Sequence, residues 1–261
     1  MLRLPIGGSD FSTHYYAYNE LPVNDTKLTN FSLTAEDFNY KIPMINHIKS
    51  VATSDVHIVA SVWSPPTWMK TSEKVNGFSF IRPQFYQTFA DYFAKFVREY
   101  KKSGIDVWGV TTTNEPVDSL LQITRFQNLG WSPGDMGKWI SENLGPTLKN
   151  ASDLQHVKIL AVDDQRVTLP IWFSVMVKQY PKVLDWIDGV AVHWYVDKFT
   201  PPTFLELVTK DHPTKFVINT EACEGSMPWQ TEKVSLGDWS RAQSYIDDII
   251  QVYFMYMTFL V

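Results

Sequence analysis

Short apolar runs rich in β-branched residues alternate with longer amphipathic segments along this chain. Each apolar run ends in a polar cluster, a pattern typical of strands that are buried on both faces of a parallel sheet. The six runs are Leu2–Ile6, His57–Val62, Val107–Thr111, Val157–Val162, Gly189–His193 and Lys215–Asn219. We therefore predict six parallel strands.

The segments between these runs predict helices. Aromatic side chains recur at helical spacing from Pro83 to Ser103, and Gly104 follows as a stop signal. Further helices are expected to begin at Thr34–Asp37, to run from Ser132-Pro133 to Gly145-Pro146, from Leu169 to Tyr180, from Leu205 to Lys210, and onward from Ser240. Strand and helix thus alternate six times.

This alternation predicts the α/β class and favours a (β/α)₈ barrel, which needs eight such units. Six units predict a truncated barrel without its first and last strands, in a single partial domain over residues 1–261. A doubly wound sheet is the weaker alternative, because no strand is followed by a glycine-rich phosphate loop.

The two ends agree with a truncated chain. We expect the first residues to form a core strand, because they do not have the pattern of a leader peptide. The apolar run Ile249–Val261 is shorter than the ~20 residues that cross a bilayer. We expect it to form a buried helix and not a transmembrane segment.

Charge and composition narrow the function classes. The 261 residues include 23 Lys and Arg against 28 Asp and Glu, and the net charge of −5 argues against nucleic-acid binding. The single cysteine, Cys223, excludes an internal disulfide and cysteine-rich metal sites. The six histidines show no His-x-His or His-x-x-x-His spacing, so no metal is predicted. An aromatic content of 15% favours carbohydrate or lipid chemistry.

Three glycosylation sequons, at Asn24, Asn30 and Asn150, lie in polar stretches. Together they favour a secreted or lysosomal protein, since N-glycans are added in the secretory pathway.

Candidate chemistry lies where each predicted strand ends, because barrels of this kind carry their active site at that rim. The rim residues are Asp10, Trp63, Asn114, Glu115, the run from Asp163 to Arg166, the run His193-Trp194-Tyr195, and Glu221. Asp163 and Asp164 are expected to be hydrogen-bonding partners of Arg166.

Two isolated glutamates, Glu115 and Glu221, each follow a strand directly. A carboxyl pair in an aromatic pocket suggests glycoside hydrolysis. One carboxyl must stay protonated, and an apolar wall and a like-charged neighbour would both raise its pKa. The alternative to a catalytic role is an ordinary ion pair at a strand end, with Arg166 as a partner.

Several motifs resemble one known family in order along nearly the whole chain. They are Asp10-Phe11-Ser12, Asn30-Phe31-Ser32-Leu33, Ser64-Pro65-Pro66-Thr67-Trp68, Asn114-Glu115-Pro116, Leu144-Gly145-Pro146-Thr147-Leu148, Asp163-Asp164-Gln165-Arg166, Ala191-Val192-His193-Trp194-Tyr195 and Glu221-Ala222-Cys223. The chain resembles glycoside hydrolase family 30, and within it the glucosylceramide-cleaving β-glucosidases.

The resemblance implies a role for each rim residue. Glu115 would be the general acid/base and Glu221 the nucleophile, with Asn114 hydrogen bonding the sugar 2-hydroxyl or the nucleophile. The remaining substrate-binding residues would be Asp10 and Trp63 on the outer glucose hydroxyls, Tyr195 on a catalytic carboxylate, and His193 and Trp194 in the pocket wall.

The family resemblance further implies a retaining β-glucosidase that hydrolyses glucosylceramide without a metal or organic cofactor, in the lysosome or after secretion. It implies contact with a lipid surface or an activator protein. The β-sandwich domain of the family has no counterpart in this chain. The alternatives are a family-30 enzyme for another β-glycan, such as xylan or β-1,6-glucan, and a non-catalytic truncated fragment.

The remaining cysteine, glutamate and tryptophan candidates are expected to have structural or peripheral roles. Cys223 is expected to be a buried structural cysteine, and Glu224 a loop residue that sequence reasoning could mistake for the nucleophile. Trp68, Trp131 and Trp229 are candidates for the wall around the aglycone, with plain packing as the alternative.

Overall fold

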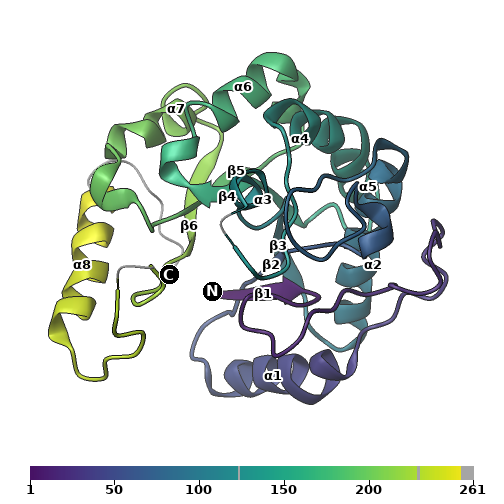
Figure 1. The fold of residues 1–261 in the computed structure, drawn as a ribbon, viewed down its shortest axis with the longest axis horizontal. Coiled ribbons are helices and arrows are strands. Elements are labelled where there is room, and N and C mark those ends of the chain that lie inside the picture. Colours follow the sequence, from purple (N-terminus) through teal and green to yellow (C-terminus); the bar gives the residue numbers. More distant parts are fainter. Residues whose placement is uncertain (123, 228–229, 254–261) are drawn as a thin grey trace.

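The computed structural model describes residues 1–122, 124–227 and 230–253. Six parallel strands form one sheet in the order β1-β2-β3-β4-β5-β6 (Figure 1). The strands are β1 (Leu2–Ile6), β2 (Ile58–Val62), β3 (Val107–Thr111), β4 (Lys158–Gln165), β5 (Gly189–His193) and β6 (Phe216–Glu221). All six predicted strands are present.

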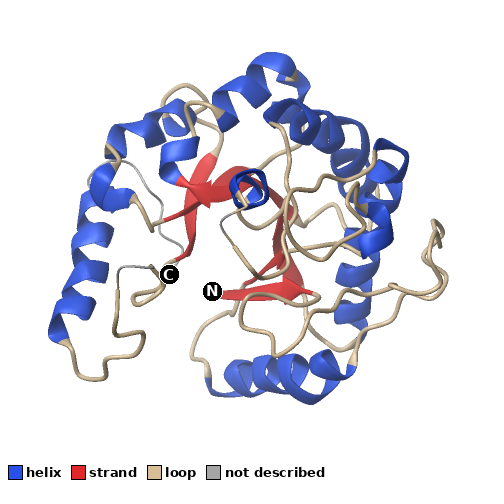
Figure 2. Ribbon diagram, viewed as in Figure 1, coloured by secondary structure: helices blue, strands red, loops and turns tan. Residues whose placement is uncertain are grey.

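Helices cover the outer face of the curled sheet (Figure 2). They are α1 (Ile42–Val51), α2 (Tyr86–Lys102), α4 (Pro133–Trp139), α5 (Gly145–Lys149), α6 (Trp172–Gln179), α7 (Glu206–Thr209) and α8 (Trp239–Tyr253). The short helix α3 (Pro116–Leu121) lies instead at the centre of the view, inside the ring of outer helices (Figure 1). Among the described residues, β1 pairs only with β2 and β6 only with β5, and an opening separates these two edges. The arrangement corresponds to six units of a (β/α)₈ barrel, as predicted.

The core between sheet and helices is densely aromatic on the α2 side. Phe89 of α2 stacks on Trp139 of α4, with ring centroids 5.0 Å apart, and Trp131 stacks on the same indole at 5.1 Å. Trp131 and Trp68 are only 1% and 4% exposed. Their proposed place in an aglycone wall is therefore wrong, because both indoles are packed inside the core. The third candidate, Trp229, lies outside the described residues.

Strand β4 is longer than predicted and carries the most unusual backbone of the sheet. Its register against β5 shifts between Val162 and Asp164. Val162 and Asp163 both adopt positive φ angles, 76° and 58°. This bulge turns the Asp163 carboxylate to His193 on the neighbouring strand β5 and to Arg3 on β1, the edge strand across the curl of the sheet. Asp163 and Asp164 thus lie within the strand, whereas the sequence pattern placed them after it.

The helix that begins after Ser132 also runs further than predicted. The Ser132 hydroxyl accepts the backbone N–H of Asp135 at 3.0 Å and caps the helix. Gly145-Pro146 does not end it. A π-helical turn, Ile140–Leu144, precedes α5 and lets the chain continue to Lys149, since the wider turn tolerates the missing N–H of Pro146.

Helix α8 confirms the helix predicted from Ser240 onward, but its burial differs from the expectation. Ile249 and Ile250 are 46% and 49% exposed, whereas Val252 is 1% exposed, so the described start of the apolar run is only partly buried. The reason is that α8 lies beside the outermost strand, β6, at the open side of the sheet (Figure 1). Residues 254–261 lie outside the described part. Within the described residues, no helix is long and apolar enough to cross a membrane.

Candidate active site

The carboxyl ends of the strands bring most of the predicted rim residues into one site. Ligand atoms of Glu115, His193 and Glu221 all lie within 4.8 Å of one another. Glu115 follows β3, and Glu221 is the last residue of β6. The two glutamates are 106 positions apart in sequence, and only the curl of the sheet brings them together.

Glu115 is held by a strained turn between β3 and α3. Its φ of 40° is left-handed, and Pro116 follows as the first residue of the helix. The backbone N–H of Glu115 donates to the Asp163 carbonyl at 2.9 Å. Its Oε1 accepts from Gln165 Nε2 at 2.6 Å and faces His193 Nδ1 at 2.9 Å. The carboxylate is thereby fixed from two neighbouring strands.

Glu221 is held from the opposite edge of the sheet. Arg3 of β1 donates to Glu221 Oε2, and Tyr195 donates to Oε1 at 2.7 Å. Arg3 thus bridges the opening between β1 and β6 with its side chain, where no backbone pairing joins these strands. It also bonds Asn114 Oδ1 at 2.7 Å and Asp163 Oδ2 at 2.8 Å.

Asp163 and His193 lie beneath the two glutamates and are both fully buried. Burial alone would raise the pKa of Asp163, but the charge of Arg3 and the hydrogen bond from His193 hold it well below its usual range. Burial opposes a charge on His193, yet its bonds to Asp163 and Glu115 raise its pKa to about 10. His193 is therefore a cation at neutral pH, and both of its ring nitrogens donate.

The electrostatics of Glu115 overturn one sequence expectation. Burial alone would raise the pKa of Glu115. The hydrogen bond and the charge of His193 outweigh burial, so the pKa of Glu115 lies below its usual value. Two neighbouring carboxyls have raised pKa values instead: that of Asp164 on β4, which burial and the charge of Glu115 raise to about 7, and that of Asp118, one turn along α3. Burial and the charge of Glu115 raise the pKa of Asp118 to about 9. Sequence reasoning missed Asp118 because it considered only strand ends.

The expected pairing of Asp163 and Asp164 with Arg166 is wrong. Arg166 is fully buried and lies 3.3 Å from Asp197 Oδ2 instead. Asp164 accepts backbone N–H groups of Val117 at 3.1 Å and Gln165 at 2.7 Å. The bulge in β4 explains the difference, since it directs Asp163 to Arg3 and His193.

Arg3 is the other residue that the sequence reading overlooked. It lies inside the partly buried strand β1 and not after a strand. A charged side chain in such a strand is a usable signal, because burying a guanidinium is costly unless carboxylates meet it.

Predicted sugar-binding residues surround the open side of the two glutamates. Trp63 is 3% exposed, carries Arg3 over its ring at 4.6 Å, and has a buried Nε1 without a described hydrogen-bond partner. Asp10 is exposed, and desolvation together with the charge of Glu221 raises its pKa to about 6. Trp194 stacks on Tyr245 of α8, with ring centroids 4.5 Å apart.

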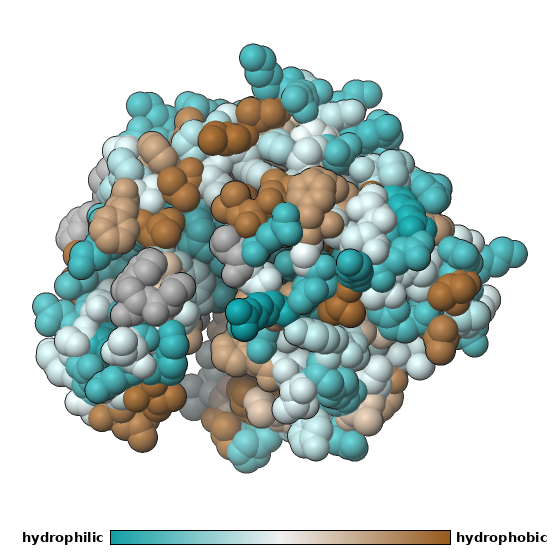
Figure 3. Space-filling model, viewed as in Figure 1, coloured by the Kyte–Doolittle hydropathy of each residue, from teal (hydrophilic) through white to brown (hydrophobic). Residues whose placement is uncertain are grey.

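A cleft of about 840 Å³ opens beside Tyr195 and Trp194, between the loop after β5 and α8. Figure 3 shows a hollow between the α8 side and the rest of the molecule. The cleft is lined by Cys223 and Glu224 as well as by charged residues of α8. Cys223 is only partly buried, which differs from the expectation of a buried cysteine, and burial and nearby carboxylates raise the pKa of its thiol. Glu224 lies in the loop beyond β6, where its N–H donates to the Tyr245 hydroxyl at 2.8 Å.

The same three side chains, Glu115, His193 and Glu221, are close enough to be considered as metal ligands. Their donor atoms are nevertheless committed elsewhere. Both nitrogens of His193 face carboxylates, and a protonated imidazole cannot bind a metal. Arg3 already neutralises Glu221. These residues do not fit a metal ion, and the absence of a metal centre stays a prediction.

Comparison with known sequences gives a family for this arrangement. The family described as "Glycosyl hydrolase family 30 TIM-barrel domain" matches residues 1–260. Lysosomal acid glucosylceramidase of Mus musculus is 39% identical over 255 residues, covering 96% of this chain and 48% of the relative. Putative glucosylceramidase 4 of Caenorhabditis elegans is 37% identical, with 95% and 48% covered. The chain spans about half the length of these relatives.

Comparison with solved structures gives the same fold. SrfJ from Salmonella typhimurium superposes with a TM-score of 0.83 at 25% sequence identity. The match covers 98% of this chain and 54% of that one.

Proposed function

Because this chain belongs to glycoside hydrolase family 30, we propose that it carries the catalytic site of a retaining β-glucosidase that hydrolyses glucosylceramide to glucose and ceramide. The observation that carries the proposal is the separation of the two glutamates. Oxygens of Glu115 and Glu221 lie within 4.8 Å of one another. Retaining glycosidases hold their carboxyls ~5–5.5 Å apart, whereas inverting enzymes leave room for a water.

In the first step, Glu221 attacks the anomeric carbon and forms a glucosyl ester. Arg3 and Tyr195 both donate to its carboxylate, which holds its oxygens in one orientation for attack. The bond between that carbon and the glycosidic oxygen breaks as Glu115 donates its proton to this oxygen. Ceramide leaves as the neutral alcohol.

In the second step, Glu115 accepts a proton from water while the water oxygen attacks the anomeric carbon. The ester bond to Glu221 breaks, and glucose leaves with a retained β configuration. Asn114 Oδ1 is occupied by Arg3, which orients the side-chain amide so that its N–H₂ donates to a sugar hydroxyl. Trp63 offers its buried indole N–H to an outer hydroxyl in the same way.

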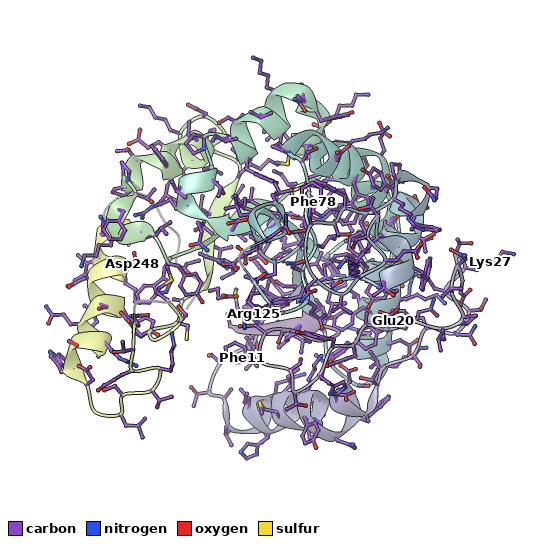
Figure 4. The ribbon with its side chains drawn as sticks, in the orientation of Figure 1. Phe11, Glu20, Lys27, Phe78, Arg125 and Asp248 are labelled. Carbon is purple, nitrogen blue, oxygen red and sulfur yellow. The ribbon has the colours of Figure 1, made fainter. Side chains whose placement is uncertain are left out.

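The glucosylceramide assignment rests on the identity to relatives that bear that name and on three exposed sequons. Asn24, Asn30 and Asn150 are all solvent-exposed, as the attachment of N-glycans would require. Phe11 is 82% exposed next to Asp10 and lies near the opening between β1 and β6 (Figure 4). An apolar side chain in this position suits the approach of a lipid surface.

Covalent labelling tests the proposal. A mechanism-based β-glucosidase inactivator with a good leaving group is expected to add one glycosyl mass, on Glu221, as read by intact-mass and peptide spectrometry. Glu221→Gln should prevent the adduct, and the matched loop variant Glu224→Gln should keep it. A folded wild-type chain that takes up no label would overturn the proposal in favour of the non-catalytic alternative.

Substrate choice is tested separately, by comparing kcat/KM for glucosylceramide in mixed micelles with that for soluble β-1,6-glucan and xylan. We expect glucosylceramide to be preferred. A labelled chain that prefers either polysaccharide would retain the mechanism and refute the lipid substrate.

A further inference from the structure

The candidate site holds more carboxyl groups than cations. Six carboxyls gather there, whereas Arg3 and His193 are the cations that face them. The carboxyls are those of Asp10, Glu115, Asp118, Asp163, Asp164 and Glu221. Excess negative charge in a buried site is costly, so some of these groups must keep a proton at neutral pH.

The hydrogen-bond donors around each carboxyl decide which one keeps it. Asp163 accepts from Arg3, His193, Thr111 and other donors, and Glu221 accepts from Arg3 and Tyr195. Glu115 faces Gln165 and His193. Asp164 accepts the backbone N–H groups of Val117 and Gln165. Asp118 is different, because it is 8% exposed and its carboxyl faces that of Glu115 within one helical turn. Two carboxyls can hydrogen bond only when one of them carries a proton.

Local backbone geometry creates this contact. The left-handed turn at Glu115 and the start of α3 at Pro116 place the two carboxyls three positions apart on one helical turn. The backbone N–H of Asp118 closes that turn on the Glu115 carbonyl at 3.0 Å. Val117, between them, donates its N–H to Asp164, which fixes the turn against β4.

We propose that Asp118 is a positioning residue that shares one proton with Glu115 and supplies it for protonation of the glycosidic oxygen. The inference rests on the proposed function. At rest the proton lies on Asp118. It crosses the hydrogen bond to Glu115, which passes it to the leaving oxygen, and both carboxyls are then ionised. In the second step Glu115 takes a proton from water and returns it to Asp118, so that the cycle closes without an outside donor.

This arrangement reconciles an acid role for Glu115 with its electrostatics. His193 lowers the pKa of Glu115, so Glu115 alone would give up its proton more readily than an ordinary glutamate. Asp118 keeps the shared proton at neutral pH, because its pKa is raised to about 9. The titratable groups that face the pair from the other elements are Arg3, Asp10, Asp164, His193, Tyr195 and Glu221.

Asp118→Asn removes the shared proton and keeps the shape of the side chain. For an alkyl β-glucoside, whose leaving group needs protonation, kcat/KM at pH 7 is expected to fall about 100-fold, the lower end of what a general acid contributes. The basic limb of the pH profile should move to lower pH. Asp118→Glu restores a carboxyl. It should recover most of the wild-type kcat/KM and return the basic limb of the pH profile towards its wild-type position. An aryl glucoside with an acidic leaving group should be nearly unaffected.

Infrared spectroscopy supplies a readout that needs no turnover. At pH 8 the wild-type chain should show a protonated-carboxyl stretch that titrates near pH 9 and is missing in Asp118→Asn. Asp197→Asn is the matched control, because it removes another buried carboxyl, with a pKa raised to about 7, beside Arg166. It should leave both the band at pH 8 and the basic limb in place.

The outcomes separate this inference from the proposed function. If Asp118→Asn keeps the band and the wild-type limb while Glu221 still takes the label, the proton-sharing role is wrong and the glycosidase proposal stands. If Glu221 takes no label but the band disappears in Asp118→Asn, the shared proton is supported and the proposed function fails.

Discussion

The surroundings of Glu115 and Glu221 differ in charge, burial and position in the sheet. Glu115 lies over the middle of the sheet, where its side chain is 11% exposed and contacts His193, Gln165 and Asp118. Glu221 ends an edge strand, is 19% exposed, and contacts Arg3 and Tyr195. One carboxyl has a neighbour that can hold a proton, and the other has only donors.

This difference teaches how one fold assigns two roles to the same residue type. A carboxylate whose two oxygens both accept hydrogen bonds from fixed donors is held in one orientation, as a nucleophile requires. A carboxyl that bonds to a second carboxyl stays next to a proton, as an acid/base requires. The comparison is sharpest where a substitution affects one glutamate and spares the other.

The largest expected effect is that of Glu115→Gln on substrates with poor leaving groups. We expect kcat/KM for an alkyl β-glucoside to fall about 1,000-fold, within the range for loss of a general acid. An aryl glucoside with an acidic leaving group should change little, because kcat/KM reports only the steps up to ester formation. Steady-state kinetics on both substrates measures this.

Glu224→Gln is the control for that series. Glu224 lies in the loop after β6 and does not contact Glu115. It should leave both kcat/KM values at the wild-type level. Equal losses on good and poor leaving groups with Glu115→Gln would contradict an acid role for Glu115.

Arg3→Met should lower both the reactivity of Glu221 and the stability of the fold. Loss of the guanidinium removes a charge next to the nucleophile, and we expect about a 100-fold fall in kcat/KM for both kinds of leaving group. It also leaves Asp163 buried with one partner fewer, so the free energy of unfolding should fall by about 3–5 kcal/mol at pH 7. Denaturant titration measures that loss.

The pH dependence of stability gives this prediction its sign. The depressed pKa of Asp163 contributes stability above the unfolded value of ~3.9, and the contribution is lost as pH falls through the folded pKa. Arg3→Met should therefore lose less stability than wild type on acidification. Arg82→Met is the control, since it breaks the exposed pair with Glu73 and should cost at most ~1 kcal/mol. If Arg3→Met lost as much stability as wild type on acidification, the depressed pKa of Asp163 would not depend on Arg3.

Sequence patterns predicted the sheet well because strands buried on both faces leave a clear signal. The runs at β1, β3 and β5 match the observed strands at both ends. They predicted the contents of the site less well. The bulge in β4 depends on positive φ angles at Val162 and Asp163, and a β-branched residue such as Val162 strongly disfavours that conformation.

Residues that act across the sheet were harder to find than residues at strand ends. Arg3 and Glu221 are 218 positions apart, and their contact exists only once the sheet has curled. Asp118 resembled an ordinary helix residue, because an acidic side chain in a first turn is common. Its contact with Glu115 follows from the left-handed turn, which no sequence signal announced.

Tyr195→Phe gives the smallest effect and the finest test of the comparison. The hydroxyl donates one bond to Glu221 Oε1 at 2.7 Å, and water can reach the partly exposed carboxylate to replace it. We therefore expect kcat/KM to fall about 10-fold, at the low end for a bond to a charged group. The loss should be the same for both kinds of leaving group, and the rate of labelling by the inactivator should fall in parallel.

Tyr245→Phe provides the matched control for Tyr195→Phe. Its hydroxyl accepts the Glu224 N–H at 2.8 Å, and its ring stacks on Trp194 in the same region. It removes a comparable bond without touching Glu221, so kcat/KM should stay at the wild-type level. A loss in Tyr195→Phe that appeared only with poor leaving groups would mean that this hydroxyl serves Glu115. The division of roles between Glu221, a nucleophile held by hydrogen-bond donors, and Glu115, an acid that shares a proton, would then be incomplete.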